Sequence, residues 1–408
     1  MTVDFGSLAP LGLPRSVQYC TRCVISNQKP VSSSESLHKI NDVKVTTSFT
    51  NGVCDACLWA EAKETVIDWD SREQELSDLC DSHRKSNGEY DVIVPVSGGK
   101  DSRYVAHLLK ERYRMNPLTV TWRPHIFTPI GLHNYFSLID SGQANILYSP
   151  RGDVQRKLTQ LAFQNLGHPF QPFIAGQRVV GPLTALKYDI KLVFYGENVA
   201  EYGNNKDDNY SPIMKPELYT CFDFSAENLS DYFLGGVPLS DLVALHGLSL
   251  SDLQPYRSPS LDEIKSKNIQ VHYMSYYRKW VPQENYYYAV KHTGFLPNER
   301  RMDGSFSKYA GIDDSLEDLH FYMQLIKFGM GRATWDAAQE VRSGKLERDE
   351  AVALVNKYGL EEPRICFDQI LEYLGLTVDQ FRLTVDKFRT PHLWTKTMGG
   401  FVLTYPLV

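Results

Sequence analysis

The chain has 408 residues, of which 42% are hydrophobic, and a formal net charge of −6. This length corresponds to roughly two or three domains, and the apolar fraction is sufficient for well-packed cores. The acidic balance disfavours a dedicated nucleic-acid-binding protein, in which a basic surface is typical. No apolar run approaches the length of a membrane span, and the N-terminal residues lack the pattern of a signal peptide. We therefore expect a cytoplasmic protein with no membrane insertion and no nucleic-acid partner.

Two C-x-x-C pairs lie near the N-terminus, Cys20 with Cys23 and Cys54 with Cys57. In a cytoplasmic chain this pattern indicates a tetrahedral Cys₄ zinc site. Four thiolates leave no open coordination position, so the zinc would be structural. The 30 residues between the pairs exceed the usual spacing, and residues 39–54 could form a hairpin there. We expect a zinc ribbon over residues 1–62, with redox-active pairs as the alternative reading.

The next predicted elements are a helix, a buried strand and a second helix. Ser71 to Gln74 fits a capping box and predicts a helix that Gly88 ends. The apolar run Val92–Val96 predicts a central strand. Val105, Leu108 and Leu109 then follow helical spacing.

The turn between that strand and helix reads Ser97-Gly98-Gly99-Lys100-Asp101-Ser102. A glycine-rich turn at a helix N-terminus presents backbone N–H groups to an anion, typically a phosphate. The Walker A pattern fails, because it requires a glycine at Val94 and Ser or Thr at Asp101. The dinucleotide fingerprint fails as well. An ordinary strand-to-helix turn with a capping serine is the alternative.

The pattern S-G-G-x-D-S after a buried strand resembles the pyrophosphate loop of the ATP pyrophosphatases. Those enzymes cleave ATP between the α and β phosphates and transfer AMP to a substrate oxygen. The resemblance implies that this loop binds the leaving pyrophosphate. Ser97 and Ser102 offer hydroxyls, Gly98 and Gly99 allow close backbone approach, and Asp101 can hold Mg²⁺. Lys100 occupies the variable position of the pattern.

Strand and helix patterns alternate after the loop. Strands are expected at 117–122, 144–150 and 190–195, and helices at 131–142 and 153–166. This alternation predicts an α/β fold with a doubly wound parallel sheet, here over residues 63–215. Ligands in such sheets bind beyond the carboxyl ends of the strands. That rule groups residues 97–102, 122–124 and 196–203 around one crevice.

The remaining chain divides into three predicted parts. Residues 216–260 read as a helical insertion, with helix caps at Ser225, Ser240 and Ser249. Residues 261–300 contain an alternating segment, 269–280, that could return to the sheet as a strand. Residues 301–408 are mostly helical and would contact substrate or partner. The segment after residue 389 shows no assignable pattern.

Several segments, taken together, resemble the bacterial N-acetyl sugar amidotransferase family of lipopolysaccharide O-antigen and surface-sugar biosynthesis. The resemblance covers about residues 18–365. It implies ATP-dependent conversion of a sugar N-acetyl group to an acetamidino group, on a nucleotide-linked sugar, with ammonia from a separate glutaminase. The segments are YCTRCV, GVCDAC, YDVIVPVSGGKDS, VTWRP, TPIGLHN, FYGENVAEYG and the long signature from DDSLEDLHFYMQ to LERDEAV.

The resemblance and the crevice together suggest site residues beyond the loop. Glu197 is a metal or acid–base candidate, or else a carboxylate at a helix start. Trp122, with Arg123, would offer backbone to adenine beside Gly196, or is a plain strand end. Lys327 and Arg332, in the same signature as Asp313, Asp314 and His320, would contact a diphosphate or carboxylate, or lie on a solvated helix face. The other expected substrate contacts are Asn134 (alternatively a helix cap), Asn198, Glu201 and Tyr202.

Two other functions fit parts of the sequence. A tRNA base-modifying enzyme with the same loop would favour a basic face and a catalytic cysteine near the strand ends, which the net charge and scattered remaining cysteines disfavour. A non-catalytic scaffold for a glutaminase or pathway partner would need no pyrophosphate loop. No spare cysteine is followed by an evident His-x-Glu pair, so we expect the chain to carry no glutaminase of its own.

Overall fold

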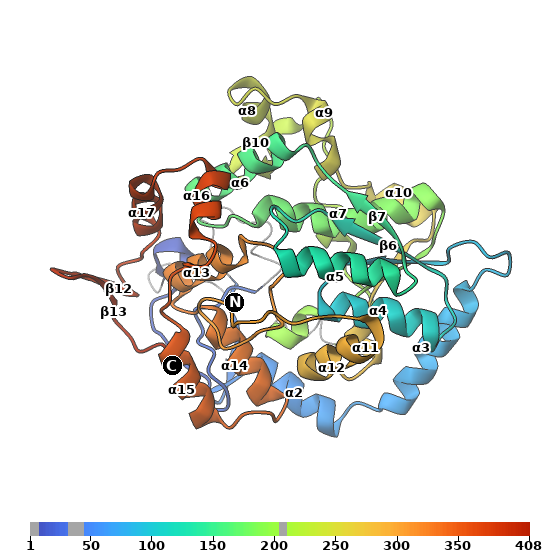
Figure 1. The fold of residues 1–408 in the computed structure, drawn as a ribbon, viewed down its shortest axis with the longest axis horizontal. Helices are drawn as coiled ribbons and strands as arrows, with labels where there is room; N and C mark the ends of the chain where they lie inside the picture. Colours follow the sequence, from blue (N-terminus) through green and yellow to red (C-terminus); the bar gives the residue numbers. More distant parts are fainter. Residues whose placement is uncertain (1–7, 32–44, 204–209) are drawn as a thin grey trace.

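The computed structural model of the protein describes residues 8–31, 45–203 and 210–408. Within these ranges its centre is a parallel sheet of five strands in the order β11-β8-β5-β6-β7 (Figure 1). The expected α/β fold with a parallel sheet is confirmed. The strands are β5 (Val92–Pro95), β6 (Pro117–Trp122), β7 (Ala144–Tyr148), β8 (Leu192–Tyr195) and β11 (Gln270–Tyr273).

Helices cover both faces of this sheet, because its strands are apolar on both sides. Val92 and Val94 of β5 pack into one core, and Ile93 between them packs into the other, as the two-residue period of a strand requires. The first core includes α3 (Trp69–His83), α4 (Lys100–Glu111) and residues of α5 (Pro129–Asp140), and α12 (Pro282–Thr293) packs on α4. The second includes α6 (Gly152–Leu166) and α7 (Gln171–Tyr188).

The strand order places a topological switch point beside β5. The chain runs from β5 to β6 and β7 on one side, then returns to β8 and β11 on the other. The loops that follow β5 and β8 therefore leave the sheet in opposite directions and open a crevice between them. This is where the sequence places the glycine-rich loop and the segment 196–203.

Several predicted boundaries shift in the structure. Helix α3 begins at Trp69, capped by Asp68, whose carboxylate accepts hydrogen bonds from the N–H groups of Asp70 and Ser71. The capping box predicted at Ser71 is therefore wrong, and the helix ends at His83, before Gly88. Strand β11 ends at Tyr273, where the short helix α11 (Met274–Tyr277) replaces the longer strand suggested by the alternating pattern.

Helix α7 was not predicted, because its sequence contains four residues that usually interrupt helices. Pro172 lies in the first turn, where its missing N–H costs no hydrogen bond. Gly176 lies against the ring of Trp122, so closely that a Cβ at this position would be 2.2 Å from ring carbons. Gly181 faces Pro95 and Tyr195 in the same way, with Pro182 beside it inside the helix. Tertiary packing thus overrides local propensity in α7.

The N-terminal region consists of short strands and one helix. Its described elements are β1 (Leu8–Ala9), η2 (Pro10–Gly12), β2 (Leu13–Pro14), β3 (Phe49–Thr50), β4 (Val53–Cys54) and α2 (Asp55–Thr65). Strands β3 and β4 form a hairpin just before the second cysteine pair. The first part of the hairpin suggested for residues 39–54 lies outside the described residues. Helix α2 continues across the expected boundary at residue 62.

The segment between β8 and β11 is mixed rather than purely helical. Its described elements are η3 (Val199–Tyr202), η5 (Pro216–Leu218), η6 (Leu229–Asp231), β9 (Phe233–Leu234), β10 (Val237–Pro238), α8 (Leu239–Ala244), α9 (Leu250–Leu253), η7 (Gln254–Tyr256) and α10 (Leu261–Ser266). The helix cap predicted at Ser249 is confirmed, with a capping box to Asp252. The other two are wrong: Ser240 lies inside α8, and no helix begins at Ser225.

The C-terminal region is helical and ends in a hairpin. It contains α13 (Glu317–Phe328), α14 (Arg332–Arg342), α15 (Arg348–Tyr358), α16 (Phe367–Leu374), α17 (Val378–Lys387), β12 (Trp394–Thr397) and β13 (Gly400–Leu403). The hairpin projects from the body of the molecule (Figure 1). Its base is held by the buried Trp394, whose indole N–H donates to the carbonyl of Ile326 at 2.7 Å. In the described parts of the chain, no helix combines the length and apolarity needed to cross a bilayer.

Candidate functional site

A cavity of about 620 Å³ opens at the carboxyl ends of β5, β6 and β8. This volume is within the range of roughly 300–1,000 Å³ found for ligand pockets. All three expected segments contribute to its lining, through residues such as Ser97, Trp122 and Glu197. The opposite wall comes from α7 and from the C-terminal segment that leads into α13 and α14.

The glycine-rich loop forms a tight turn at the start of α4. Gly98 has a φ of +98°, and a Cβ there would lie 3.1 Å from the backbone nitrogen of Tyr135. Glycine is therefore needed at this position for both conformation and space. Within the loop, the Ser97 hydroxyl accepts from Gly99 N–H at 3.2 Å, and the Ser102 hydroxyl donates to the Gly99 carbonyl at 3.3 Å. The N-terminus of α4 therefore points its positive end at the cavity.

A buried arginine lies behind the loop. Arg103 is fully buried, and its guanidinium donates to the carbonyl of Gly98 at 2.8 Å, to the carbonyl of Thr293 at 2.6 Å and to the hydroxyl of Ser137 at 2.7 Å. Burial lowers the pKa of Arg103 to about 10, so it stays charged at neutral pH. The guanidinium fixes the glycine turn and places a cation directly behind the loop. The sequence alone gave no signal for this role.

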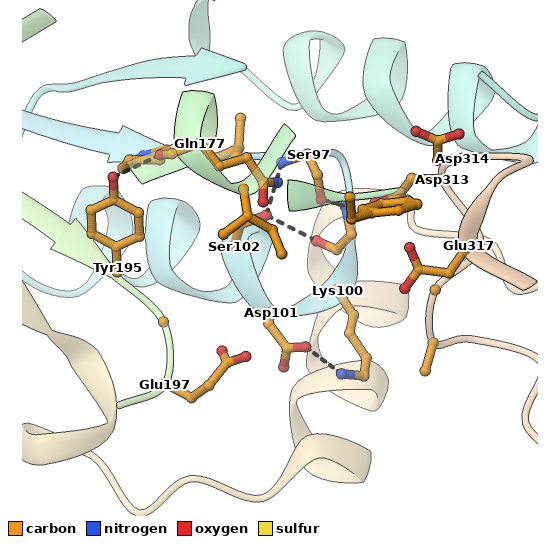
Figure 2. Close-up of a pocket in the computed structure, with 18 of the residues that line it drawn as sticks. Ser97, Lys100, Asp101, Ser102, Gln177, Tyr195, Glu197, Asp313, Asp314 and Glu317 are labelled. Carbon is orange, nitrogen blue, oxygen red and sulfur yellow. Dashed lines mark hydrogen bonds and ion pairs between the residues drawn. The ribbon is translucent and has the colours of Figure 1, made fainter. Parts of the chain in front are cut away.

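Polar groups gather beside the loop at the start of α4. Lys100 forms an ion pair with Asp101, and the second oxygen of Asp101 accepts from the side-chain amide of Asn285 at 3.0 Å. Glu197 accepts from the Tyr202 hydroxyl at 2.7 Å. Burial and the neighbouring Asp101 raise the pKa of Glu197. Figure 2 shows the carboxylates of Asp101 and Glu197 on the same side of the cavity, an oxygen donor pair of the kind that Mg²⁺ prefers.

The C-terminal wall carries a second group of charged residues. Arg332 pairs with Asp336 at 3.0 Å and approaches Glu317 at 3.6 Å. Asp314 accepts from the imidazole and the backbone N–H of the buried His125, both at 2.7 Å, and so ties this wall to the chain after β6. Burial lowers the pKa of His320 to about 3, so this pocket residue is neutral.

The other end of the cavity is apolar and aromatic. It includes Val120, Trp122, Phe170, Phe173 and Tyr195. The indole nitrogen of Trp122 is buried and has no hydrogen-bond partner among the described residues. A planar base could lie against this surface, with the phosphate-binding loop at the polar end. Trp122 and Gly196 both line the cavity, and the adenine contact expected there stays a prediction.

Four predicted substrate contacts have structural partners instead and do not line the cavity. Asn134 is buried and bonds through both side-chain atoms to the backbone of Leu296. Asn198 caps η3 through Ala200 N–H. The other two are held by ion-pair or backbone contacts: Glu201 with Lys63 at 2.7 Å and with Trp59 at 2.9 Å, and the buried Lys327 with the carbonyl of Leu166 at 3.2 Å. Tyr202 and Arg332 do line it.

The four predicted cysteine ligands converge. Their sulfur atoms all lie within 4.8 Å of one another, with 3.8 Å from Cys20 to Cys57 and 3.7 Å from Cys23 to Cys54. A tetrahedral site with zinc–sulfur bonds of about 2.3 Å has sulfur separations of about 3.8 Å. The cysteines therefore fit a structural zinc ion. Arg342 reinforces this fit, because its guanidinium lies 3.9 Å from Cys23 Sγ and would offset the negative charge of four thiolates.

Comparison with known proteins finds a family similar to the C-terminal part of the chain. Residues 303–406 match the family described as "LPS biosynthesis protein WbpG-like, C-terminal domain". This WbpG-like region is about a quarter of the chain and includes α13, α14 and the terminal hairpin. It therefore contributes Glu317, Arg332 and Asp336 to the cavity, together with Asp313 and Asp314.

Two further similarities are more limited. An uncharacterized protein of Methanocaldococcus jannaschii is 36% identical over 52 residues, which cover 13% of this chain and 19% of that protein. The chain thus matches only about a fifth of that relative's length. The NH₃-dependent NAD synthetase of Campylobacter jejuni, solved with a nitrate ion, aligns at 16% identity with a TM-score of 0.26. That alignment covers 58% of this chain and all of the synthetase chain, and a TM-score this low carries no argument.

Sequence reasoning missed pocket residues that come from α7 and α14. Gln177, Arg178, Trp335 and Gln339 line the cavity. No local motif marks the first two, and the last two lie in the long C-terminal signature without an assigned role. Asp313 and Asp314 were noted as part of the C-terminal signature, without an assigned role. The bridge between Phe127 and Asp314 brings that signature to the loop after β6, a contact between segments far apart in the sequence.

Proposed function

We propose that this protein is an ATP-dependent N-acetyl sugar amidotransferase. It converts an acetamido group of a nucleotide-linked sugar to an acetamidino group, in lipopolysaccharide O-antigen or related surface-sugar biosynthesis. One observation carries the proposal: the S-G-G-K-D-S loop faces the WbpG-like region across a single cavity. A pyrophosphate-binding loop implies transfer of AMP, and the WbpG-like region links that chemistry to lipopolysaccharide biosynthesis.

The proposed chemistry converts the amide oxygen, a poor leaving group, into a good one. An amide carbonyl is a poor electrophile, and its oxygen leaves poorly. Transfer of AMP to that oxygen releases pyrophosphate and makes an O-adenylyl imidate. Ammonia then adds to the carbon, and AMP departs with the former amide oxygen. Water in place of ammonia would regenerate the amide and waste ATP, so a cavity that excludes water favours the productive reaction.

The residues near the loop have distinct proposed roles. Ser97, Gly98, Gly99 and Ser102 hold the leaving pyrophosphate, while the start of α4 and the buried Arg103 stabilise its negative charge. Lys100 lies beside the same phosphates. Asp101 and Glu197 would hold Mg²⁺, which supplies charge neutralisation to the phosphates when bound.

The proposed partners follow from the same reaction. The substrate is a nucleotide-linked sugar that enters between Tyr202 and the WbpG-like wall, where Arg332 can face an anionic group. Ammonia comes from a separate glutaminase subunit. Because ATP and nucleotide sugars are cytoplasmic metabolites, we place the reaction in the cytoplasm, with no nucleic acid or membrane insertion involved.

A product assay tests the proposal. The purified protein is incubated with ATP, Mg²⁺, ammonium and a set of nucleotide-linked diacetamido sugars. We expect AMP formation that depends on one of these sugars, and a product whose mass reflects replacement of one oxygen by NH. AMP formation without any such product, or no reaction with the whole set, would contradict the proposed amidotransferase activity.

A further inference from the structure

Two carboxyl groups of the WbpG-like wall face the phosphate-binding loop without a hydrogen-bonded cation. Asp313 Oδ2 lies 3.2 Å from the position that a Cβ of Gly99 would occupy. The other oxygen, Asp313 Oδ1, is buried and has no hydrogen-bond partner among the described residues. The nearest cation to Glu317 is Arg332, at 3.6 Å, beyond hydrogen-bond distance. Figure 2 shows Glu317 across the cavity from the start of α4, with its carboxylate directed toward the loop.

This arrangement is unexpected in a cavity that should bind phosphates. Two other carboxylates of the cavity pair with cations: Asp101 of the loop with Lys100, and Asp336 of the WbpG-like wall with Arg332. Uncompensated carboxylates near a phosphate would repel it. Burial raises the pKa of Asp313 to about 6 and that of Glu317 to about 8, so a cation bound beside them would favour their charged forms. The geometry therefore calls for a cation that arrives with the reaction.

The proposed reaction brings such a cation and creates another. Its nitrogen donor exists in water mainly as ammonium, and its product, an amidine, is a strong base that leaves as the amidinium ion. The substrate acetamido group is neutral. Two carboxyl groups without a hydrogen-bonded cation therefore favour the nitrogen donor and the product over the starting amide, and stabilise positive charge as it develops.

We propose that Asp313 and Glu317 form the subsite for ammonium and for the amidinium product, with Glu317 as the base that takes a proton from ammonium. This inference rests on the proposed function. Asp313, beside the loop, holds the cation next to the carbon that reacts. Both residues belong to the WbpG-like region, so the nitrogen donor and the pyrophosphate are handled by opposite walls of one cavity.

The proposed step consumes one ammonium ion and releases AMP. Glu317 accepts one proton from NH₄⁺, and the lone pair of the resulting NH₃ forms a bond to the imidate carbon. The C=N electron pair moves to the sugar nitrogen, which takes a proton from the incoming nitrogen. The C–O bond then breaks with its electrons on the AMP oxygen, leaving an amidinium ion and AMP. Glu317 releases its proton when the products depart.

A binding experiment with two small probes tests the subsite independently of the sugar. Acetamidinium and acetamide have nearly the same shape, but only the first is charged. Binding of each probe is measured by calorimetry in the presence of AMP, for the wild type, Asp313→Asn and Glu317→Gln. The matched control is Asp318→Asn, which removes an acid from the same helical turn but borders a different cavity.

We expect the wild type and Asp318→Asn to bind acetamidinium at least tenfold more tightly than acetamide. Asp313→Asn and Glu317→Gln should lose most of that preference. Equal binding of the two probes by the wild type, or an unchanged preference in Glu317→Gln, would overturn the inference. Retained thermal stability in both variants shows that a lost preference does not result from unfolding.

A kinetic comparison separates this inference from the proposed function. In the full reaction, Glu317→Gln should raise the KM for ammonium at least tenfold while the KM for ATP stays near the wild-type value. If the wild type amidinates a sugar but Glu317→Gln has an unchanged KM for ammonium, the subsite is wrong and the proposed function stands. If the wild type amidinates no sugar, the proposed function fails, whatever the probes show.

Discussion

At the scale of single residues, the negative charge of Asp101 decides whether this side chain can bind Mg²⁺ or serves only to hold its neighbours in place. Its carboxylate contacts Lys100 on one side and Asn285 on the other, so it is already fixed in position. Glu197 shares the same part of the cavity, and its raised pKa reports the repulsion between the two carboxylates as well as burial. A Mg²⁺ ion between them would remove that repulsion.

Asp101→Asn isolates this charge. The asparagine keeps the shape of the side chain and an oxygen for Asn285, but it cannot bind Mg²⁺ as a carboxylate does. We expect AMP formation to fall by about a hundredfold or more, as when one preorganised electrostatic contact is removed, with the fold and the zinc content unchanged. AMP release is measured with sugar and ammonium present, and wild-type rates in Asp101→Asn would refute the metal role.

Glu317 should also give the ligand-free protein a pH-dependent stability. Burial raises its pKa from 4.5 to about 8. Between these values the folded state holds a proton that the unfolded chain has released, so the free energy of unfolding falls as pH rises. Glu317→Gln lacks this group, and we expect its stability relative to the wild type to increase from about pH 5 to about pH 8. Urea denaturation of both proteins measures the difference, and parallel pH profiles would contradict it.

At the scale of elements, α7 forms part of the cavity wall, and two of its glycines admit neighbouring side chains. Gly176 is the tighter case, since a methyl group there would overlap the ring of Trp122. Gly176→Ala should therefore destabilise the protein by about 1–3 kcal/mol, the usual range for overpacking. Gly152→Ala is the matched control, because it is also helical and its nearest neighbour is 3.9 Å away. Denaturant unfolding that shows equal stabilities for both variants would contradict the packing argument.

Helix α7 also shows which parts of the fold could not be predicted from the sequence. The parallel sheet, its switch point and the glycine-rich loop follow from local patterns, because buried strands and a helix N-terminus leave direct signatures. Helix α7 does not, because its two glycines are explained by Trp122 and Pro95, which lie far away in the sequence. Lys327 fails for a related reason: its charge suggested a ligand contact, but helix packing directs it to Leu166.

At the scale of the whole molecule, the cysteine cluster is connected to the cavity through η3. Helix α2 carries Cys57, and from the same helix Trp59 and Lys63 hold the carboxylate of Glu201 in η3. Arg342 of the WbpG-like region adds a contact to the Glu201 carbonyl. Tyr202, the next residue, holds Glu197 in the cavity. A loss of zinc should therefore loosen η3 and the position of Glu197 in the cavity.

Removal of zinc tests this connection. The protein should contain one zinc per chain, bound by Cys20, Cys23, Cys54 and Cys57, and Cys54→Ser should lose it. On chelation we expect faster amide hydrogen exchange at Val199–Tyr202, with strand β7 unchanged as an internal control. If freshly purified protein contains no zinc, or if exchange rises equally in both segments, the proposed connection between the zinc site and η3 is wrong.

We expect the ammonia to come from a separate glutaminase rather than from this chain. The proposed reaction needs NH₃, and we expect the chain to use glutamine only with a partner glutaminase. Free ammonium should replace that partner, and more effectively at higher pH, because only unprotonated NH₃ attacks carbon. If the partner delivers ammonia directly into the cavity, the glutamine-dependent reaction should resist additives that trap ammonia in solution. The decisive measurement is the purified chain with ATP, sugar and glutamine alone. Efficient amidination under those conditions, with no contaminating glutaminase, would mean that the chain contains its own ammonia source.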